Sequence, residues 1–187
     1  MYRAIAWKAL HDGLPLDNED AVAALAERAV LAVGPSSVVI DGHDVTNAIR
    51  TPEIDRAAAA AARLPKVRAA LVDRQREEGK SGGIVMEGRD IGSVVFPDAE
   101  VKIYLDASPA ERARRRAADP SHALSRAAAA ADVASEMAAR DQSDRTRSTS
   151  PLQIPKDAIE LDTTELSIED TVNRVLAIVN QAITVRR

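Results

Sequence analysis

Two short apolar segments separated by a charged turn most restrict the folds that this chain can adopt. Residues 84–86 and 101–105 are apolar runs without a regular alternation of apolar and polar residues. A third run, residues 158–161, precedes the last predicted helix. Strands without that alternation are typical of parallel sheets that are buried on both faces. The order of strands and helices therefore predicts an α/β fold in which helices flank a parallel sheet.

The remaining segments predict helices, because alanine favours helix strongly and fills much of them. We expect helices over residues 1–10, 20–31, 56–78 with an interruption near Pro65, 109–118, 123–145 and from Ser167 onward. Asp17 or Asn18 can cap the second helix. Ser108-Pro109-Ala110-Glu111 has the sequence of a capping box with proline at the first helical position. Residues 29–33 and 38–40 predict a small hairpin.

Composition excludes several classes of protein and site. The chain has 187 residues, enough for one domain with a full core, and its net charge of -4 argues against a nucleic-acid partner. It has no cysteine, and its three histidines lie far apart in the sequence, so we expect no disulfide, no thiol nucleophile and no metal site. The sequence has no apolar stretch of 18 residues and no signal peptide. We therefore expect a cytoplasmic protein without membrane contact.

The charged turn Glu87-Gly88-Arg89-Asp90 directly follows the first apolar run. In open parallel sheets, ligands bind at the carboxyl ends of the strands. Arg89 can bind phosphate, and Asp90 can accept a hydrogen bond from the exocyclic amine of cytosine. Arg68, on a predicted helix, is either a further member of this pocket or a surface arginine whose stem packs on the helix. We interpret the turn as the floor of a nucleotide pocket.

Two arginine-rich helix faces follow. Arg112, Arg115 and Arg116 share one face of their helix, which is either a solvated face or a clamp for an anion such as a polyphosphate. Arg140 and Arg147 share a face with Asp144 on the next helix, where an intrahelical ion pair is the alternative. Because a proline break separates the two helices, we interpret them together as a mobile lid that closes over phosphates.

Short stretches along the chain combine into one pattern: Met1-Tyr2-Arg3-Ala4, Ile49-Arg50-Thr51, Leu64-Pro65-Lys66-Val67-Arg68, Glu87-Gly88-Arg89-Asp90-Ile91-Gly92, Val94-Val95-Phe96-Pro97-Asp98-Ala99, Lys102-Ile103-Tyr104-Leu105-Asp106-Ala107-Ser108, Arg140-Asp141, Asp144, Arg147, Pro151-Leu152 and Leu161-Asp162-Thr163-Thr164. With this combination the chain resembles bacterial cytidylate kinases over nearly its whole length. The combination is highly specific, and the run from Gly88 to Ala99 alone nearly identifies the family.

The resemblance implies a substrate site made of residues from several segments: Tyr2, Arg3, Arg68, Arg89, Asp90, Arg140, Asp144 and Arg147. Arg3, Arg89 and Arg147 would clamp the phosphate of CMP. Arg68 and Asp90 would bind the edge of the cytosine base.

The resemblance also implies a catalytic group. Arg112 and Arg116 would bind the phosphates of ATP from the lid, and together with Arg147 they would carry catalysis. Asp144 and Arg140 would contact the sugar and its surroundings. ATP, with Mg2+ carried by the nucleotide, would be the co-substrate, and CMP or dCMP would be converted to CDP or dCDP in pyrimidine nucleotide metabolism. Positioning and charge neutralisation would supply most of the rate.

The fold implied by the resemblance is that of the P-loop nucleoside monophosphate kinases, with a parallel sheet, flanking helices and a small β-containing insert. Residues 1–28 and 45–187 would form the kinase core, residues 29–44 the insert, and residues from about 112 to 147 the arginine-rich lid. We expect a monomer that binds small nucleotides.

Two departures from the family pattern matter. Ala59 stands where the family usually offers a serine hydroxyl to the base, and the loss of one hydrogen bond, about 1 kcal/mol, predicts looser discrimination between CMP and UMP. The chain also contains no Gly-x-x-x-x-Gly-Lys-Ser/Thr sequence, the loop that cradles the ATP phosphates. The family carries this loop on its first strand, so we expect the first two strands to be absent, Met1 to be an internal methionine, and these residues alone to lack kinase activity.

Three functions are compatible with these features. The first is a CMP/dCMP kinase whose ATP site is missing from these 187 residues. The second is a non-catalytic, shortened homologue that binds CMP. The third is an alanine-rich helical interaction module, which nucleotides would not stabilise.

Overall fold

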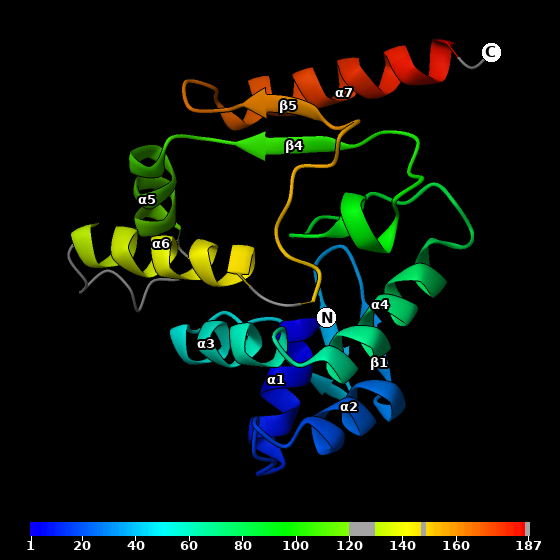
Figure 1. The fold of residues 1–187 in the computed structure, drawn as a ribbon, viewed down its shortest axis with the longest axis vertical. Helices are drawn as coiled ribbons and strands as arrows, with labels where there is room; N and C mark the ends of the chain where they lie inside the picture. Colours follow the sequence, from blue (N-terminus) through cyan, green and yellow to red (C-terminus); the bar gives the residue numbers. More distant parts are fainter. Residues whose placement is uncertain (120–129, 147–148, 186–187) are drawn as a thin grey trace. The chain divides into compact units, whose positions relative to one another are not determined.

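The computed structural model describes residues 1–119, 130–146 and 149–185, which divide into two compact units (Figure 1). The first unit is made mainly of Met1–Ile84. The second unit is made of Val85–Arg116, Ala130–Thr146 and the residues from Ser150 onward. Each unit is held together by its own set of helices and its own small sheet.

Among the described residues, the first unit is built mainly from α1 (Tyr2–His11), α2 (Glu19–Arg28), α3 (Pro52–Ala61) and α4 (Pro65–Gly79). α1 packs against α3, and α2 packs against α4. Ile5, Leu25 and Leu71 are fully or almost fully buried where these helices meet. Many of the buried positions in this core are alanine, whose small side chain lets helices approach closely.

Polar side chains cap two helices of this unit, one at a predicted residue and one at a residue that was predicted to lie in a loop. Asn18 caps α2 by accepting a hydrogen bond from the backbone N–H of Ala21 (3.1 Å), which settles the choice between Asp17 and Asn18. Thr51 caps α3 in the same way through the N–H of Ile54 (3.3 Å). α3 therefore begins at Pro52, four residues earlier than predicted, because proline fits the first helical position.

The N-terminus of α4 is capped by another helix. Leu64 precedes α4 and has no side chain that can accept a hydrogen bond. Instead, Oε1 of Glu19, in the first turn of α2, accepts a hydrogen bond from the backbone N–H of Lys66 (2.7 Å). The carboxylate also lies at the positive end of the α4 dipole. Glu19 thus joins the N-termini of α2 and α4.

Replacing Glu19 by alanine is expected to lower the free energy of unfolding of the first unit by about 1 kcal/mol, the typical cost of a lost N-cap. Urea denaturation followed by the fluorescence of Trp7, the sole tryptophan, measures this change. Asp20→Ala is the control, because the ion pair of Asp20 with Lys66 joins two highly exposed side chains. Equal effects of the two substitutions would contradict the capping role.

The predicted hairpin forms, and it gains a third strand. β1 (Leu31–Val33) pairs with β2 (Val38–Ile40), and β2 pairs with β3 (His43–Asp44), both antiparallel. The β2–β3 turn at Asp41 and Gly42 has positive φ angles of 48° and 79°. His43 lies beside α1, where its ring is 5.6 Å from that of Trp7. The small sheet therefore contacts α1 through aromatic rings.

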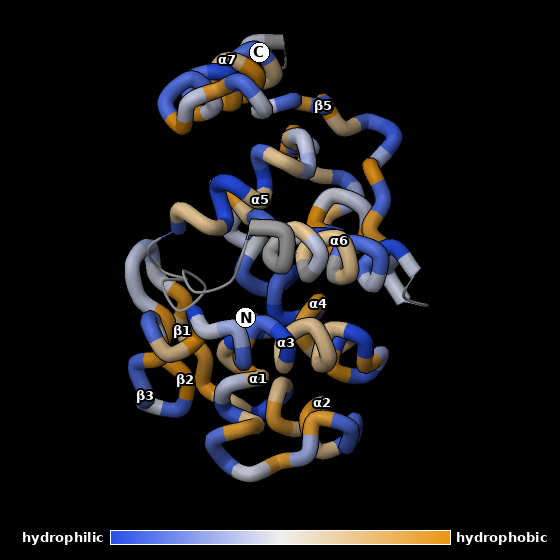
Figure 2. The backbone as a smooth tube through the Cα atoms, turned by 90° about the vertical axis from the view of Figure 1, so that its left-hand side faces the viewer, coloured by the Kyte–Doolittle hydropathy of each residue, from blue (hydrophilic) through white to orange (hydrophobic). Residues whose placement is uncertain are grey.

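The second unit contains the parallel pair β4 (Ile103–Asp106) and β5 (Ile159–Asp162), which lie side by side in Figure 1. Its helices are α5 (Pro109–Ala118), α6 (Ala130–Thr146) and α7 (Ile168–Val185). α7 alternates between polar and apolar residues in Figure 2, and Val172 and Leu176 of its apolar face are about half exposed. The expected parallel sheet is thus confirmed for these two strands.

Residues 84–86 do not form the predicted strand. Within the described ranges, no strand pairs with them, and Val85 is 98% exposed. A strand is stabilised by hydrogen bonds to its neighbour, so an apolar run alone does not suffice to form one. The predicted helix over residues 123–145 is described from Ala130, because residues 120–129 lie outside the described part.

Within the described residues, no helix is both long enough and apolar enough to span a membrane.

Candidate functional site

Two arginines and two aspartates of the second unit form a charged network. Nη1 of Arg89 lies 3.4 Å from Oδ1 of Asp141, and Nε of Arg89 lies 3.5 Å from Oδ2 of Asp144. Nη2 of Arg112 lies 2.6 Å from Oδ2 of Asp141. The two aspartates are three residues apart on α6, so they share one face of that helix. Three separate segments therefore place their charged side chains together.

The backbone around Arg89 takes an unusual form. After Asp90 the chain makes the π-helical turn η1 (Ile91–Val95), in which the carbonyl of Asp90 accepts hydrogen bonds from Val94 and Val95. Single π-helical turns are rare and occur frequently at functional sites. A side chain at Gly88 would come within 2.8 Å of Cγ1 of Ile91, so glycine permits this close approach. Asp90, predicted to bind the base, is 7% exposed.

Helix α5 begins with half of the predicted capping box. Ser108 accepts a hydrogen bond from the backbone N–H of Glu111 (3.3 Å), as expected. The carboxylate of Glu111 does not complete the box, because it binds Arg114 through two bonds of 2.7 Å and Arg115 through a third of 2.7 Å. The N–H of Ser108 donates to Thr164 instead.

Arg115 was predicted to share an anion clamp with Arg112 and Arg116, but in the structure it binds protein groups instead. Its guanidinium donates to Oγ1 of Thr163 (2.9 Å) and to the carbonyls of Thr163 and Leu166. It therefore anchors α5 to the segment that follows β5. The arginines on this helix face therefore have different partners. Arg115 binds the segment after β5, whereas Arg112 contacts Asp141 on α6.

Hydrogen bonds from Arg114, and then from Arg115, hold the pKa of Glu111 at about 2, below the ordinary value of 4.5. The ionised carboxylate therefore stabilises the fold fully above about pH 4.5, and this contribution is lost as the pH falls toward 2.

We expect Glu111→Gln to have a lower free energy of unfolding than the wild type at pH 7, with a difference that narrows steadily between pH 4.5 and 2. Thermal unfolding of both proteins across this range measures it. A difference that does not change with pH would contradict the ion pairing.

The first unit holds three of the predicted site residues, Tyr2, Arg3 and Arg68. The guanidinium of Arg68 lies 5.7 Å from the ring centroid of Tyr2, in a cation–π arrangement, and donates to the carbonyl of Ala62 (3.2 Å). Arg68 is 2% exposed, so it is not the surface arginine of the alternative interpretation. Arg3 donates to the carbonyl of Ile49 (3.0 Å) and pairs with Asp55 at 2.6 Å. Protein groups therefore orient both arginines.

The remaining predicted residues belong to the two arginine-rich helices. Arg116 lies on α5 and is partly buried. Arg140 lies on α6, one residue before Asp141, and Arg147 lies outside the described residues. No role was predicted from the sequence for Asp55 or Asp141. The position of Asp141, three residues before Asp144 on the same helix, is the signal that could have identified it.

A model of the cytidylate kinase family matches residues 1–181. The chain belongs to the cytidylate kinase family. It is 46% identical to the cytidylate kinase of Desulfitobacterium hafniense (strain Y51), over 98% of this chain and 80% of the relative. The cytidylate kinase of Geobacillus sp. (strain WCH70) is 44% identical, over 98% and 83%. A bifunctional pantoate ligase/cytidylate kinase of Synechococcus sp. (strain RCC307) is 42% identical, over 95% of this chain and 36% of the relative.

The resemblance inferred from the sequence is thus confirmed. This cytidylate kinase family member is a kinase, that is, a transferase, and the family implies the P-loop nucleoside monophosphate kinase fold. The described residues contain no cluster of three His, Asp or Glu side chains that could hold a metal ion.

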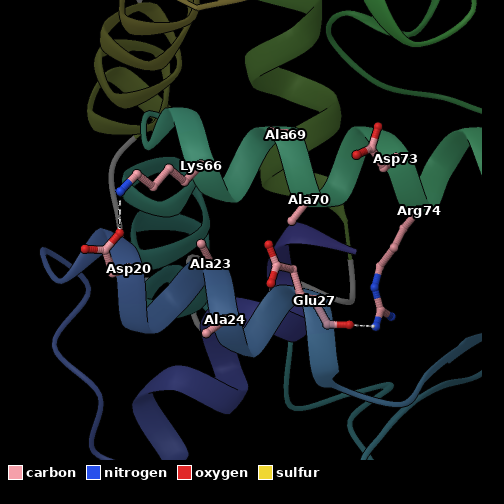
Figure 3. Close-up of a pocket in the computed structure, with 9 residues that line it drawn as sticks. All are labelled: Asp20, Ala23, Ala24, Glu27, Lys66, Ala69, Ala70, Asp73 and Arg74. Carbon is pink, nitrogen blue, oxygen red and sulfur yellow. Dashed lines mark hydrogen bonds and ion pairs between the residues drawn. The ribbon is translucent and has the colours of Figure 1, made fainter.

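A groove between α2 and α4 of this family member contains none of the predicted site residues. Its lining is small or charged, and Figure 3 shows it: Asp20, Ala23, Ala24, Glu27, Lys66, Ala69, Ala70, Asp73 and Arg74. Lys66 pairs with Asp20 at one end, and Arg74 donates to the carbonyl of Glu27 (2.7 Å) at the other. We interpret it as the seam between two packed helices, because the arginines expected to bind phosphate do not line it.

Proposed function

We propose that this protein transfers the γ-phosphoryl group of ATP to CMP or dCMP. The observation that carries the proposal is the meeting of Arg89 and Arg112, from separate segments, at one carboxylate in a member of the cytidylate kinase family. Guanidiniums from several segments suit an anion with many oxygens, because each can donate two parallel hydrogen bonds. The relatives' names support cytidine nucleotides as the substrate class.

The substrate roles are assigned within this proposal. Arg3, Arg89 and Arg147 bind the CMP phosphate, and Arg68 and Asp90 bind the base. The burial of Arg68 beside Tyr2 and the burial of Asp90 support these roles, since a buried charged group that is already oriented loses little freedom when a ligand arrives.

The remaining roles are assigned in the same way. Arg140 and Asp144 contact the sugar and its surroundings on the substrate side, Arg112 and Arg116 bind the ATP phosphates, and Arg147 shares in catalysis. Arginines that close onto the transferring group stabilise charge where it develops. Exclusion of water by the lid, residues from about 112 to 147, prevents hydrolysis of ATP. The domain division at residues 29–44, the monomeric state and the cytoplasmic location remain predictions.

We further propose that these 187 residues bind CMP without phosphorylating it. Their sequence contains no Gly-x-x-x-x-Gly-Lys-Ser/Thr loop, and backbone amides of such a loop cradle the ATP phosphates. In the family fold this loop follows a strand that would lie beside residues 84–86 and β4. The exposed, unpaired state of residues 84–86 agrees with that arrangement.

Calorimetric titration with CMP, dCMP and UMP, together with an assay of CDP formation from CMP and Mg-ATP, tests these proposals. We expect CMP and dCMP to bind and no CDP to form. UMP should bind more weakly than CMP, and the difference in affinity should be small because Ala59 offers no hydroxyl to the base. Absence of nucleotide binding would overturn the CMP site and favour the helical interaction module. Formation of CDP by these residues alone would overturn the requirement for the phosphate-binding loop.

A further inference from the structure

Asp141 joins two arginines that come from different elements. Its Oδ2 lies 2.6 Å from Nη2 of Arg112 on α5, and its Oδ1 lies 3.4 Å from Nη1 of Arg89. Each oxygen of one carboxylate therefore faces a different guanidinium. The Asp141 side chain is 15% exposed, so water screens these pairs less than it screens pairs on an open surface.

We propose that Asp141 is a positioning residue whose carboxylate sets the spacing between Arg89 and Arg112, so that one phosphoryl group can contact both. The inference rests on the proposed function, in which Arg89 binds the phosphate of CMP and Arg112 those of ATP. A guanidinium has five N–H donors, so each arginine keeps donors for phosphate while it contacts Asp141. Without a carboxylate between them, the two like charges repel each other.

The two contacts of Asp141 differ in length, and this assigns different behaviour to the arginines. The short contact holds Arg112 firmly, and the long one leaves Arg89, whose side chain is 40% exposed, able to shift toward a ligand. Asp144 contacts Arg89 from one helical turn further along. Arg89 thus lies between two carboxylates of one helix face. Because Asp141 also contacts Arg112, its carboxylate sets the position of Arg89 relative to Arg112.

Asp141→Asn distinguishes a positioning role from a simple charge effect, because the two predict opposite changes in the affinity for CMP. Removal of a negative charge beside two arginines should strengthen anion binding if charge alone matters. If Asp141 positions the arginines, CMP binding weakens instead, by about 5- to 20-fold, which lies within the range of coupling between contacting residues. Calorimetric titration of the 187-residue chain measures the change. Unchanged or tighter CMP binding by a folded variant would overturn the proposal.

Two further variants serve as controls. Asp157→Asn removes the same charge from the same unit, but Asp157 is an exposed carboxylate that pairs with Lys102, so CMP affinity should stay within about twofold. Asp141→Glu keeps the charge and moves it by one methylene, so it should bind CMP more weakly than the wild type. If Asp141→Asn does not fold, Asp141→Glu decides, and wild-type affinity in that variant would contradict a role in spacing.

A double-mutant cycle with Arg89→Ala tests whether Asp141 affects CMP binding through Arg89. If Asp141 acts by positioning Arg89, the loss caused by Asp141→Asn disappears once Arg89 is alanine. Additive losses would show that Asp141 acts elsewhere and would overturn the proposal.

Inorganic tripolyphosphate, as a second probe, separates this inference from the proposed function. It carries the phosphate chemistry that Arg89 and Arg112 are proposed to bind but no base. If the wild type binds tripolyphosphate and not CMP, the CMP site fails, and the effect of Asp141→Asn on tripolyphosphate binding decides this inference. If the wild type binds neither probe, both proposals are overturned.

Discussion

Replacing Arg89 by alanine is expected to weaken CMP binding by about 1.5–3 kcal/mol, or roughly 10- to 150-fold, because a hydrogen bond to a charged group contributes this much. Arg89 follows residues 84–86, at the edge of the π-helical turn, and contacts both Asp141 and Asp144. Its loss removes a phosphate donor and leaves two mostly buried carboxylates facing the ligand. Calorimetric titration with CMP measures the affinity.

The matched control is Arg114→Ala. Arg114 is 71% exposed and pairs with Glu111 on the surface of α5, so its loss should leave CMP affinity unchanged. Arg89→Lys keeps the charge but not the planar fork of donors, and it should recover part of the affinity. Equal losses from Arg89→Ala and Arg114→Ala would mean that net charge, and not the place of Arg89, governs binding.

Replacing Leu71 by alanine is expected to lower the free energy of unfolding of the first unit by about 2–5 kcal/mol. Leu71 is 0% exposed on α4 and packs into the core shared with α1 and α2. Truncation removes apolar contacts and leaves a cavity that alanine-rich neighbours, which are already small, fill poorly. Urea denaturation followed by Trp7 fluorescence reports on this unit, because Trp7 lies on α1.

Two further substitutions serve as controls for Leu71→Ala. Leu71→Met conserves volume and should cost less than about 1.5 kcal/mol. Val30→Ala, at a residue that is 74% exposed in the same unit, should change stability by no more than about 0.5 kcal/mol. A cost at Leu71 as small as that at Val30 would show that this core is not close-packed.

Local signals in the sequence predicted most of the helices. Asn18, Thr51 and Ser108 cap helices because a short polar side chain can reach a backbone N–H in the first turn, whatever lies elsewhere in the chain. The two strands of the parallel pair were also predicted, with boundaries shifted by one or two residues. The strand predicted at residues 84–86 was wrong, because a strand also requires a neighbour that an apolar run cannot supply.

Side-chain partners were harder to predict. Spacing on α5 placed Arg112 and Arg115 on one face, but it could not show that Arg115 would bind the segment after β5 while Arg112 would meet α6. Both choices depend on contacts between residues about 30 to 50 positions apart. Asp55 and Asp141 were overlooked for the same reason.

By itself, the sequence determined the α/β class, the caps of α2 and α5, the family and the arginines that a phosphate-binding protein needs, since each depends on residue type and short spacing. The tertiary structure decided which charges meet. It placed one carboxylate between Arg89 and Arg112, gave Arg115 to the scaffold, and left residues 84–86 without a partner strand among the described residues. The physical reason is that ion pairs and sheet ladders form between segments distant in the chain, so their partners exist only once the chain has folded.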